Sequence, residues 1–450
     1  MVIVRETFSQ AVIAGFEGYG FHSEAPTIHE WPMDMFSTGS DLTPLKEGID
    51  HVIYGLTQWQ PKVTKKGLVS AGERPTVTGK DYEEALANLN HLFLRKRWGD
   101  GLPILPPTEE RVNWILTGTD LARDVLVGGG KILPKGGRTS VEALAIALAM
   151  AGGRPEYLPV LIAAVEAITK TPPGEPGHIA WASTTRSTFA NVIVNGPMGR
   201  QIRLNARYGV MGPDPLLPAG GSIGRAIAFL LRILGGNLPG AGAMAIYGFM
   251  RYTNAVFAED EAGLPKGWKS LAEEQGFAKG SNVVTVIPAM SAENTQLHQA
   301  IGPSTEDEEI QFLYRIAGDI GVPGQIGGYV ADGPGFSSGL VLMGYNMAKV
   351  LSELGWSKEK VKEFLREHAT PSWEQLVRTG RVDPKAKPKS IKIAPVTLVI
   401  AGGDQSSQAC FMRPYHQHSP TNAEIRLPAR AKWDALLAQA EKDLGPIPAI

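Results

Sequence analysis

The 450-residue sequence predicts a mixed α/β or α+β fold, in which a small N-terminal α/β piece precedes a large glycine-rich α/β module. Short apolar runs that end in glycine turns alternate with segments of helical spacing. Several of these runs are continuously apolar, as strands buried on both faces are. The chain also holds 52 glycines and 33 prolines, which indicates many tight turns. We find no internal repeat.

Residues 1–62 are predicted to form the small N-terminal piece. Val2–Val4 has the pattern of a strand, Glu6–Phe16 has helical spacing, His29–Met33 resembles a strand that ends in a loop, and Leu45–Leu56 again has helical spacing. An α/β unit usually begins with a strand and its own ligand-binding loop. Because the strand here begins at the second residue, we expect the chain to enter such a unit midway.

Residues 63–80 are polar without a strong period and are predicted to be a linker, after which residues 81–450 form the large module. Asp81 is expected to cap a helix that runs to about Trp98. Thr108 is expected to cap the next helix, whose first turn carries two glutamates at the positive end of the helix dipole.

The stretch GDGLPILPP, residues 99–107, lies between these two helices. Its prolines fix φ and remove backbone donors, so the loop should be stiff. We interpret it as the rigid wall of a pocket to which Asp100 contributes the one ionisable group.

Further strands and helices alternate along the large module. In order, the pattern predicts a strand, a glycine loop and a helix capped near Thr139 or Ser140 within 125–153, a helix over Tyr157–Ile168, a strand over 192–197, a helix over Ser222–Leu234, a strand over 282–288, helices over Glu306–Gly318 and Leu340–Leu354, a helix over Lys358–His368 capped by Ser357, and a strand over 396–403.

Composition and charge exclude several classes of protein. A net charge of −1 without a basic block argues against nucleic acid as the main partner. The single cysteine, Cys410, excludes an intrachain disulfide and a cysteine-based zinc site, which fits a cytoplasmic location. The first residues have no pattern of a signal peptide, and no apolar run reaches the roughly 20 residues of a membrane span.

Two short motifs admit a structural and a functional interpretation. GGGKILPKGG, residues 128–137, is either a structural turn, an anion-binding loop or a nucleotide loop, but its lysines stand at the wrong offsets for a phosphate-binding loop. Gly335–Gly339 fits the G-x-S-x-G pattern with Ser337 as nucleophile, but a loop rather than a strand precedes it.

The C-terminal part offers two further candidates. His416 and His418, with Asp404 nearby in sequence, either hold a metal ion or belong to a polar loop. Cys410 has Arg413 and His416 close in sequence and is either a reactive thiolate or an inert small apolar residue. The motifs identify no cofactor.

The segment 193–261 is dense in glycine, which lets backbone approach a ligand, and it also carries polar residues of catalytic type. These are Asn195, Arg203, Asn205, Arg207, Arg225, Asn237, Arg251, Asn254, Glu259, Asp260 and Glu261. Arg225 begins an apolar helix, so it must reach solvent or pair with a carboxylate. A structural Arg225–Glu259 pair is therefore the alternative to an active-site role.

Five motifs in the order found here resemble the large module of a bacterial family associated with selenoprotein-like proteins that carry a Sec/Cys-Gly-Ser-Cys (UGSC) motif. They are Asp100-Gly101-Leu102-Pro103, Pro106–Val112, Gly152 with Pro155–Pro159, Asn195-Gly196-Pro197 and Ile223-Gly224-Arg225-Ala226. The resemblance runs from about residue 81 to 370. Arg251-Tyr252-Thr253 departs from it by replacing a Gly-Lys type stretch, and Phe336 by replacing a polar position.

Residues 2–62 are similar to the latter half of the small UGSC-type module, whose Gly-Ser-Cys element the sequence lacks. The resemblance implies that a separate small chain supplies the thiol or selenol and completes the N-terminal unit. It therefore implies a hetero-oligomer.

The leading hypothesis is a cytoplasmic enzyme subunit that acts on a small molecule where the segment 193–261 meets the 99–108 loop, by thiol-dependent redox or by lyase or hydratase chemistry. Glu259 is predicted as the general acid or base, and Arg225 and Arg251 as groups that hold an anion or stabilise charge. The predicted substrate-contacting residues are Asn195, Asn205, Tyr247, Asn254 and Asp100. Glu259→Gln and Arg225→Ala should abolish turnover with little change in melting temperature.

Two alternatives remain. A non-catalytic scaffold that holds a small redox chain predicts no polar pocket in 193–261 and a large apolar patch on residues 1–62. A serine hydrolase would use Ser337.

Overall fold

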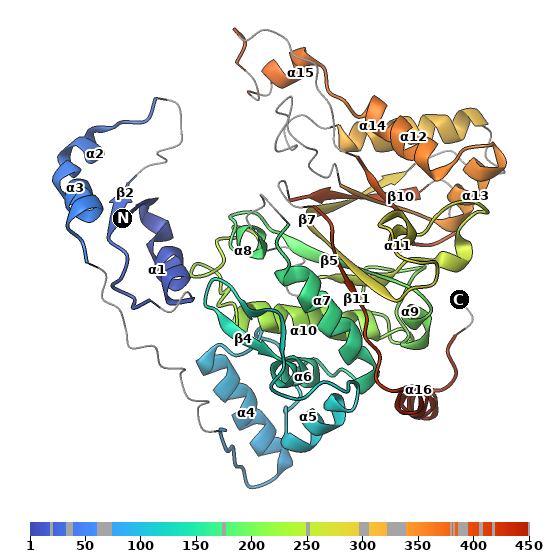
Figure 1. Cartoon of the computed structure of the whole chain (residues 1–450), viewed down its shortest axis with the longest axis horizontal. Helices are drawn as coiled ribbons and strands as arrows, with labels where there is room; N and C mark the ends of the chain where they lie inside the picture. The colour runs from blue at the N-terminus through green and yellow to red at the C-terminus, as the bar shows by residue number, and fades with distance from the viewer. Residues whose placement is uncertain are drawn as a thin grey trace.

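The computed structural model describes residues 1–18, 21–32, 39–60, 74–172, 177–248, 253–296, 306–321, 339–378, 380, 383–385, 395–404, 408–415 and 419–448. Within them the fold is mixed α/β, as predicted, with strands gathered into one large curled sheet (Figure 1).

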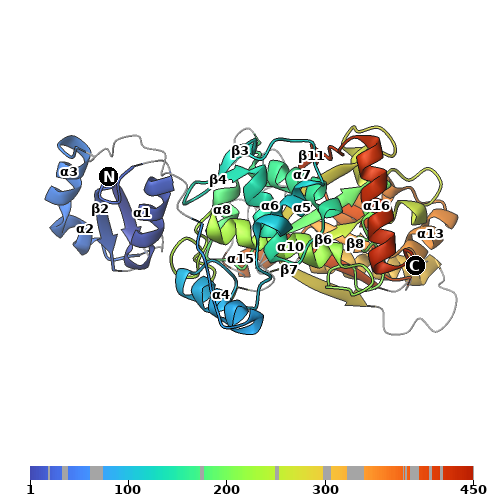
Figure 2. The ribbon, with the colours of Figure 1, turned by 90° about the horizontal axis from the view of Figure 1, so that it is seen from below.

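Residues 1–60 form a lobe that lies apart from the main body in two perpendicular views (Figures 1 and 2). Its strands β1 (Val2–Arg5) and β2 (Ile28–Trp31) pair in parallel, and helix α1 (Ser9–Gly18) connects them. Helices α2 (Thr43–Glu47) and α3 (Ile49–Thr57) follow. Among the residues described, no hydrogen bond or ion pair joins this lobe to the rest of the chain.

Two predicted caps begin the first helices of the main body. The side chain of Asp81 accepts a hydrogen bond from the Glu84 N–H at 2.9 Å and starts α4 (Tyr82–Lys96). Thr108 accepts one from the Arg111 N–H at 3.3 Å and starts α5 (Glu109–Leu116). Part of the predicted linker lies along this body, because Arg74 pairs with Glu109.

The glycine-rich stretch 128–137 lies in a hairpin of β3 (Leu126–Ile132) and β4 (Gly137–Ser140). Ser140, one of the two predicted caps, then accepts a hydrogen bond from the Ala143 N–H and starts α6 (Val141–Met150). The stretch therefore lies within a hairpin rather than in a loop directly before the helix, with Lys131, Ile132 and Gly137 in strand pairs and residues 133–136 in the turn.

The elements that follow are, in order, α7 (Leu158–Thr169), α8 (His178–Ala182), β5 (Phe189–Asn195), α9 (Met198–Gln201), α10 (Ala219–Ile233), β6 (Ala255–Ala258), α11 (Leu271–Glu274), β7 (Val283–Gln296), α12 (Glu306–Ile320), β8 (Leu340–Met343), α13 (Tyr345–Glu353), α14 (Lys358–His368), α15 (Trp373–Arg378), β9 (Thr397–Ile400), β10 (Gln408–Pro414), β11 (Thr421–Glu424) and α16 (Arg430–Leu444). Short 3₁₀ helices span Glu6–Phe8, Pro155–Tyr157 and Glu261–Gly263.

The large sheet repeats one pattern of strand connection, although we find no repeat in the sequence. Its order is β6-β5-β7-β10-β8-β9, with β11 added beside β7. In the first half β5 is parallel to β6 and antiparallel to β7. In the second half β8 is parallel to β9 and antiparallel to β10. An approximate two-fold axis therefore relates the two halves.

Hydrogen bonds fix which residues correspond in the two halves. The Glu259 N–H donates to the Val194 carbonyl at 3.0 Å, and the Ala401 N–H donates to the Met343 carbonyl at 3.0 Å. At the centre, one part of β7 pairs with β10 and another part pairs with β11. β7 and β10 therefore run antiparallel to each other where the two halves meet. The outer edges also approach each other, because the Asp260 N–H donates to the Ile400 carbonyl at 2.7 Å.

Alternate side chains of the strands enter different cores, as a curled sheet requires. Inward-facing residues of all six central strands share one core, for example Phe189, Phe257 and Met412. The outward faces of β5, β6 and β7 pack against α6, α7 and α10, and those of β8, β9 and β10 pack against α12, α13 and α14.

The structure corrects one predicted helix. Leu340–Leu354 was expected to be helical throughout, but Leu340–Met343 is strand β8 and the helix α13 begins at Tyr345. Gly344, the N-cap of α13, separates them in an extended conformation, and β8 is fully buried between two strands. A short buried strand and a buried turn of helix have the same apolar pattern, so the sequence did not distinguish them.

Within the described residues, no helix combines the length and apolar character that crossing a membrane requires.

Candidate functional site

The carboxyl ends of the parallel strands β5 and β6 carry the densest group of predicted site residues. Asn195 ends β5, and Glu259, Asp260 and Glu261 follow β6 directly. Because neighbouring parallel strands end at the same edge of a sheet, these residues converge there.

A cleft of about 390 Å³ opens at this edge. This volume lies in the range of small-molecule sites. Its lining residues are Gly196, Pro197, Arg200, Leu204, Asn205, Ala206, Arg207, Leu217, Ala258, Glu259, Asp260, Glu261, Ala262, Ile447 and Pro448.

Asn195 links two carboxylates with one amide group. Its Nδ2 donates to Glu259 Oε2 at 2.7 Å and to Glu261 Oε1 at 2.8 Å. The Gly196 N–H also donates to Glu261 Oε1, at 3.1 Å. Among the described residues the second oxygen of Glu261 accepts no hydrogen bond, and the residue is only partly buried. Glu261 is thus held by one oxygen while the other stays available in the cleft.

Glu259 is fully buried, with a side chain 0% exposed. Its Oε2 also accepts a hydrogen bond from the Leu271 N–H at 2.7 Å, and its Oε1 lies 3.5 Å from Nζ of Lys358. Burial raises the pKa of Glu259, against the opposing effect of Lys358. The predicted acid–base carboxyl therefore lies behind the cleft surface.

Lys358, at the first position of α14, is a functional candidate that the sequence did not reveal. Its side chain is fully buried, and Nζ contacts Glu259, Glu274 at 3.3 Å and the Lys269 carbonyl at 2.8 Å. A positive charge is unfavourable at a helix N-terminus. In the sequence, the one sign of this contact was a lysine directly after the cap Ser357. A lysine at that position suggests that a carboxylate lies close to it.

Asp260 and Arg207 form the other charged pair of the cleft. Arg207 Nε donates to Asp260 Oδ2 at 3.0 Å, and the guanidinium lies over the Tyr345 ring, 4.6 Å from its centre. The terminal nitrogens of Arg207 and the side chain of Arg200 make no hydrogen bond to any described residue. Both arginines can therefore bind an anionic group.

The equivalent positions in the second half carry no polar side chain. From the strand registers, the counterparts of Asn195, Glu259, Asp260 and Glu261 are Gly344, Ala401, Gly402 and Gly403. The two halves share a strand arrangement but not these groups. The polar set is therefore not a requirement of the fold itself.

Arg225 and Asp100 lie elsewhere, which corrects two expectations. Arg225 pairs with Asp100, not with Glu259: its Nε lies 2.7 Å from Asp100 Oδ2 and its Nη2 3.0 Å from Oδ1. Gly224 of α10 packs against the Thr253 carbonyl before β6, whereas Glu259 follows β6. The 99–108 loop and the Glu259 cluster therefore lie near opposite ends of β6 and do not form one site.

Asp100 is nearly buried, with its side chain 1% exposed. Burial by itself would raise the pKa of Asp100, but hydrogen bonds from Arg225 and the Leu102 N–H bring it below the usual 3.8. This ionised pair fastens the loop to α10.

Two predicted substrate-contacting asparagines use their side chains within the fold. Asn254 accepts from the Ala190 N–H and donates to the Gly224 carbonyl, each at 3.0 Å. Asn205 donates to the Tyr208 carbonyl and accepts from the Arg207 N–H, which shapes the cleft wall. Tyr247 is 92% exposed and lines neither the cleft nor the Asp100 loop.

Several candidates lie outside the described residues, namely Arg251, Ser337, His416 and His418. Elsewhere in the described ranges, no three histidine, cysteine or carboxylate side chains form a group that would hold a metal ion. Cys410 is buried, and burial raises the pKa of its thiol to about 11. Burial of Cys410 and the pairing of Arg413 with Glu293 favour the inert apolar alternative over a reactive thiolate.

Comparisons of the chain with protein-family models, with curated proteins and with solved structures each found no match.

Proposed function

We propose that the chain is an enzyme subunit that acts on a small carboxylic acid in the cleft at the carboxyl ends of β5 and β6. The observation that carries this proposal is the pairing of a tethered carboxylate, Glu261, with the unpaired N–H groups of Arg207 and Arg200 in one cleft. The polar cleft also favours an enzyme over a scaffold without such a pocket.

Glu261 acts as the general base in this proposal. It removes a proton from a carbon next to a carbonyl or carboxyl group of the substrate, and the C–H electron pair forms an enolate. The reverse step returns a proton to the same carbon, and this enolisation is the step that lyases and hydratases share. Arg207 and Arg200 hold the substrate carboxylate. Asn195 orients Glu261, and the buried Glu259 and Lys358 hold Asn195 in place.

A solvent-deuterium experiment tests this assignment. The chain is incubated in D₂O with a panel of 2-oxo and 3-hydroxy acids of about three to six carbons, a size that suits the cleft. Proton NMR follows the loss of the C–H signal. We expect exchange above the buffer rate for at least one acid, and a loss of about 100-fold or more in Glu261→Gln.

Glu441→Gln is the matched control, because Glu441 is an exposed glutamate of α16 whose side chain makes no hydrogen bond to any described residue. It should exchange at the wild-type rate. If no acid of the panel exchanges above the buffer rate, or if Glu261→Gln keeps the wild-type rate, the proposal is wrong.

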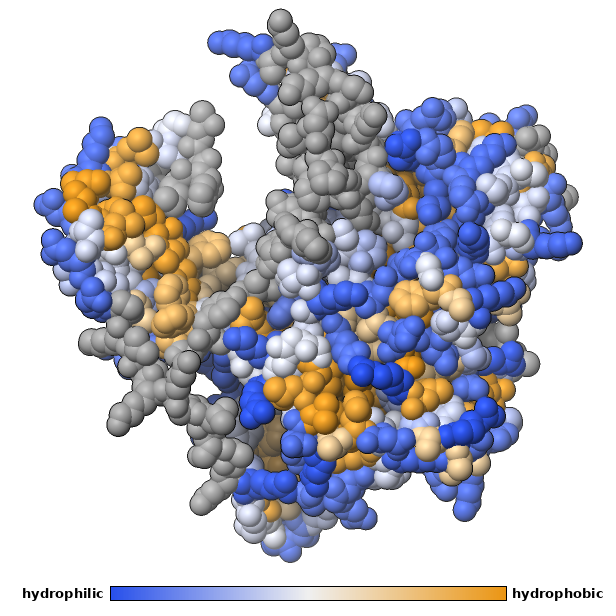
Figure 3. Space-filling view, in the orientation of Figure 1, coloured by the Kyte–Doolittle hydropathy of each residue, from blue (hydrophilic) through white to orange (hydrophobic). Residues whose placement is uncertain are grey.

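We also propose that the subunit works in the cytoplasm with a separate small chain that carries a Gly-Ser-Cys sequence and docks on the N-terminal lobe. The support is an apolar stripe on α3 formed by Ile49, Ile53 and Leu56, with Leu56 70% exposed. Apolar surface of this lobe is visible in Figure 3. Such a chain would add thiol-dependent redox chemistry.

Native mass spectrometry of the complex purified from its own cells tests the partner. We expect a second small chain whose peptides contain Gly-Ser-Cys, and its loss in Ile53→Asp/Leu56→Asp. Recovery of a fully active chain without any such partner would refute this part of the proposal and leave the cleft assignment intact.

A further inference from the structure

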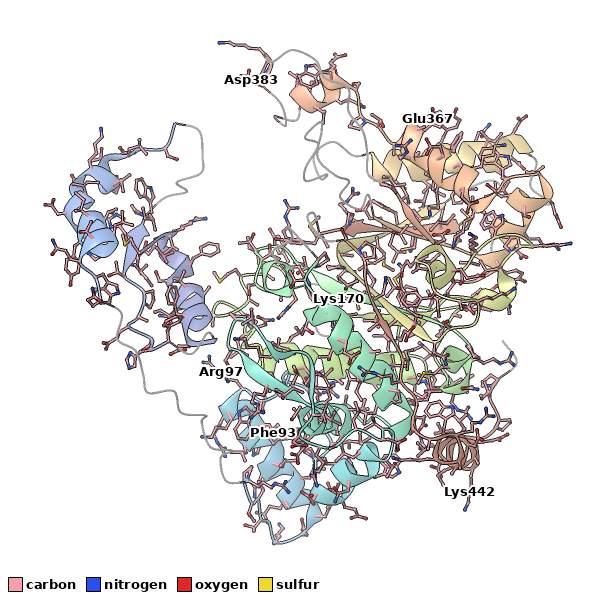
Figure 4. The ribbon with its side chains drawn as sticks, viewed as in Figure 1. Phe93, Arg97, Lys170, Glu367, Asp383 and Lys442 are labelled. Atoms are coloured by element: carbon pink, nitrogen blue, oxygen red, sulfur yellow. The ribbon has the colours of Figure 1, made fainter. Side chains whose placement is uncertain are left out.

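A second cavity, of about 310 Å³, lies on a different part of the main body, between the C-terminal end of α4, the 99–104 loop and the C-terminal end of α10. Phe93 and Arg97, from α4 and its C-cap, are labelled in Figure 4. The lining residues are Asn90, Phe93, Leu94, Arg97, Gly99, Asp100, Gly101, Leu102, Ile104, Arg232, Leu238 and Pro239.

Arg232 is the unusual member of this lining. It lies in the last turn of α10 and is partly buried, yet its side chain makes no hydrogen bond or ion pair with any described residue. Arg225, two turns earlier on the same helix face, has both Asp100 oxygens and the Pro103 carbonyl as acceptors. No side-chain nitrogen of Arg232 is both fully buried and without a partner, so its N–H groups face the open cavity and are available to an acceptor there.

Asp100 does not supply that acceptor. Its Oδ2 accepts from Arg225 Nε, and its Oδ1 accepts from Arg225 Nη2 and from the Leu102 N–H. Asp100 is hydrogen-bonded by Arg225 and acts on Arg232 only through its charge, so the one carboxylate of the cavity lies near three arginines, Arg97, Arg225 and Arg232. The cavity is therefore electropositive.

Two other features stabilise Arg232 only in part. The negative end of the α10 dipole favours a cation there but offers no directed acceptor in the cavity. A space of about 10 Å³, the size of one water, touches Arg232 and the buried Asn237, whose Oδ1 has no partner. One water there would satisfy one of five N–H groups. Partial burial lowers the pKa of Arg232, against the opposing effect of the Asp100 charge.

We propose that this cavity binds a small organic oxyanion, a carboxylate or phosphate monoester joined to a compact apolar group. Arg232 and Arg97 bind the oxyanion by charge-assisted hydrogen bonds. The side chains of Phe93, Leu94, Leu102 and Ile104 contact the apolar group. The stiff 99–107 loop forms one wall and Asp100 holds that wall in place through Arg225.

Isothermal titration calorimetry on the full chain tests the proposal with six probes. Four of them, the shaped probes, carry a phenyl ring next to a polar group, and two are anions without a ring. The shaped probes are phenyl phosphate, phenylacetate, phenylacetamide and benzyl alcohol, and the small ones are inorganic phosphate and acetate. We expect phenyl phosphate or phenylacetate to bind and the neutral probes to bind at least about 10-fold more weakly. Which of the two anions binds more tightly identifies the headgroup.

Arg232→Met should weaken the binding of the preferred anion by about 10- to 100-fold, since it removes charged hydrogen bonds and keeps most of the apolar stem. Arg232→Lys keeps the positive charge but loses the planar guanidinium. It should therefore bind the anion more tightly than Arg232→Met and more weakly than the wild type. Arg138→Met is the matched control and should bind the anion as the wild type does. Arg138 is an exposed arginine of β4 whose side chain makes no hydrogen bond to any described residue.

Three outcomes would overturn the proposal. They are no binding of either shaped anion, unchanged binding in Arg232→Met, or equal binding of inorganic phosphate and phenyl phosphate. Neither Arg232 nor Arg97 lines the cleft at β5 and β6, and the readout is binding rather than turnover. The result is therefore independent of the proposed function.

Discussion

At the scale of single residues, burial decides what the ionisable groups do. Glu259 and Cys410 are both buried beside strands of the large sheet, and burial raises the pKa of each. Glu261, two residues after Glu259, keeps an oxygen free in the cleft. Glu259 and Glu261 have the same side chain but differ in their access to solvent, which local sequence does not show.

Replacing Glu259 tests its raised pKa. Because the folded protein holds this proton more tightly than the unfolded chain, the carboxyl stabilises the fold most below pH 4.5, its ordinary value, and loses that contribution as pH rises through the raised pKa. The stability of the wild type relative to Glu259→Gln should therefore fall between pH 4.5 and 8. Urea unfolding at several pH values measures it. An increase with pH would mean that the ion pair with Lys358 dominates instead.

Cys410 should be unreactive in the folded protein. With a pKa of about 11 and 9% exposure, roughly one thiol in a thousand is ionised at pH 8. Iodoacetamide at pH 8 should leave Cys410 unmodified in buffer and modify it fully in 8 M urea, as peptide mass spectrometry would show. Rapid modification without urea would contradict the buried position.

At the scale of elements, one ion pair joins a proline-rich loop to a helix. Asp100 and Arg225 hold the 99–107 loop against α10, while the caps Asp81 and Thr108 fix the helices on either side. Arg225 therefore holds the loop near its start through Asp100 and at its middle through the Pro103 carbonyl, and Thr108 fixes its end. It borders two cavities, one through Asp100 and the other through Pro106 and Pro107.

Arg225→Met should destabilise the protein by about 3 kcal/mol, because it leaves the nearly buried Asp100 carboxylate without its partner. This prediction differs from the expectation, drawn from the sequence, that Arg225→Ala leaves the melting temperature almost unchanged. Asp100→Asn/Arg225→Met should cost less than the sum of the two single variants, since no charge remains unpaired. Additive losses in urea unfolding would show that the pair is not coupled.

At the scale of the whole molecule, the main body consists of two similar halves and the N-terminal lobe lies beside it. Each half contributes two parallel strands and a third, antiparallel strand, and the third strands, β7 and β10, pair at the centre. The first half alone carries the polar residues at its strand ends. Both halves keep the same strand pairing, although only one has polar residues at its strand ends. The strand pairing therefore does not depend on the polar residues of the cleft.

Removing the N-terminal lobe should leave the main body folded. No hydrogen bond or ion pair joins residues 1–60 to the rest of the described chain. A chain that begins at residue 74 should therefore keep its melting temperature within about 3 °C of the full protein and keep phenyl phosphate or phenylacetate binding. A loss of more than about 10 °C in calorimetry would show that the lobe is part of the cooperative unit.

The sequence by itself determined the mixed fold class, several helix caps and the residue types of the site. Asp81, Thr108, Ser140 and Ser357 act locally, through a hydrogen bond to an N–H three residues away, so the local pattern is enough to find them. The strand that ends at Asn195 was predicted over 192–197, whereas the short strand β6 before Glu259 was not predicted.

Only the tertiary structure decided the partners. Asp100 lies 125 residues from Arg225, and Lys358 lies 99 residues from Glu259, so their pairing depends on how α10 and α14 pack on the sheet. The repeat of the two halves was hidden because strand pairing is preserved by apolar side chains of many kinds. Local hydrogen bonds are specified by nearby residues, whereas burial and long-range charge pairing exist only once the chain has folded.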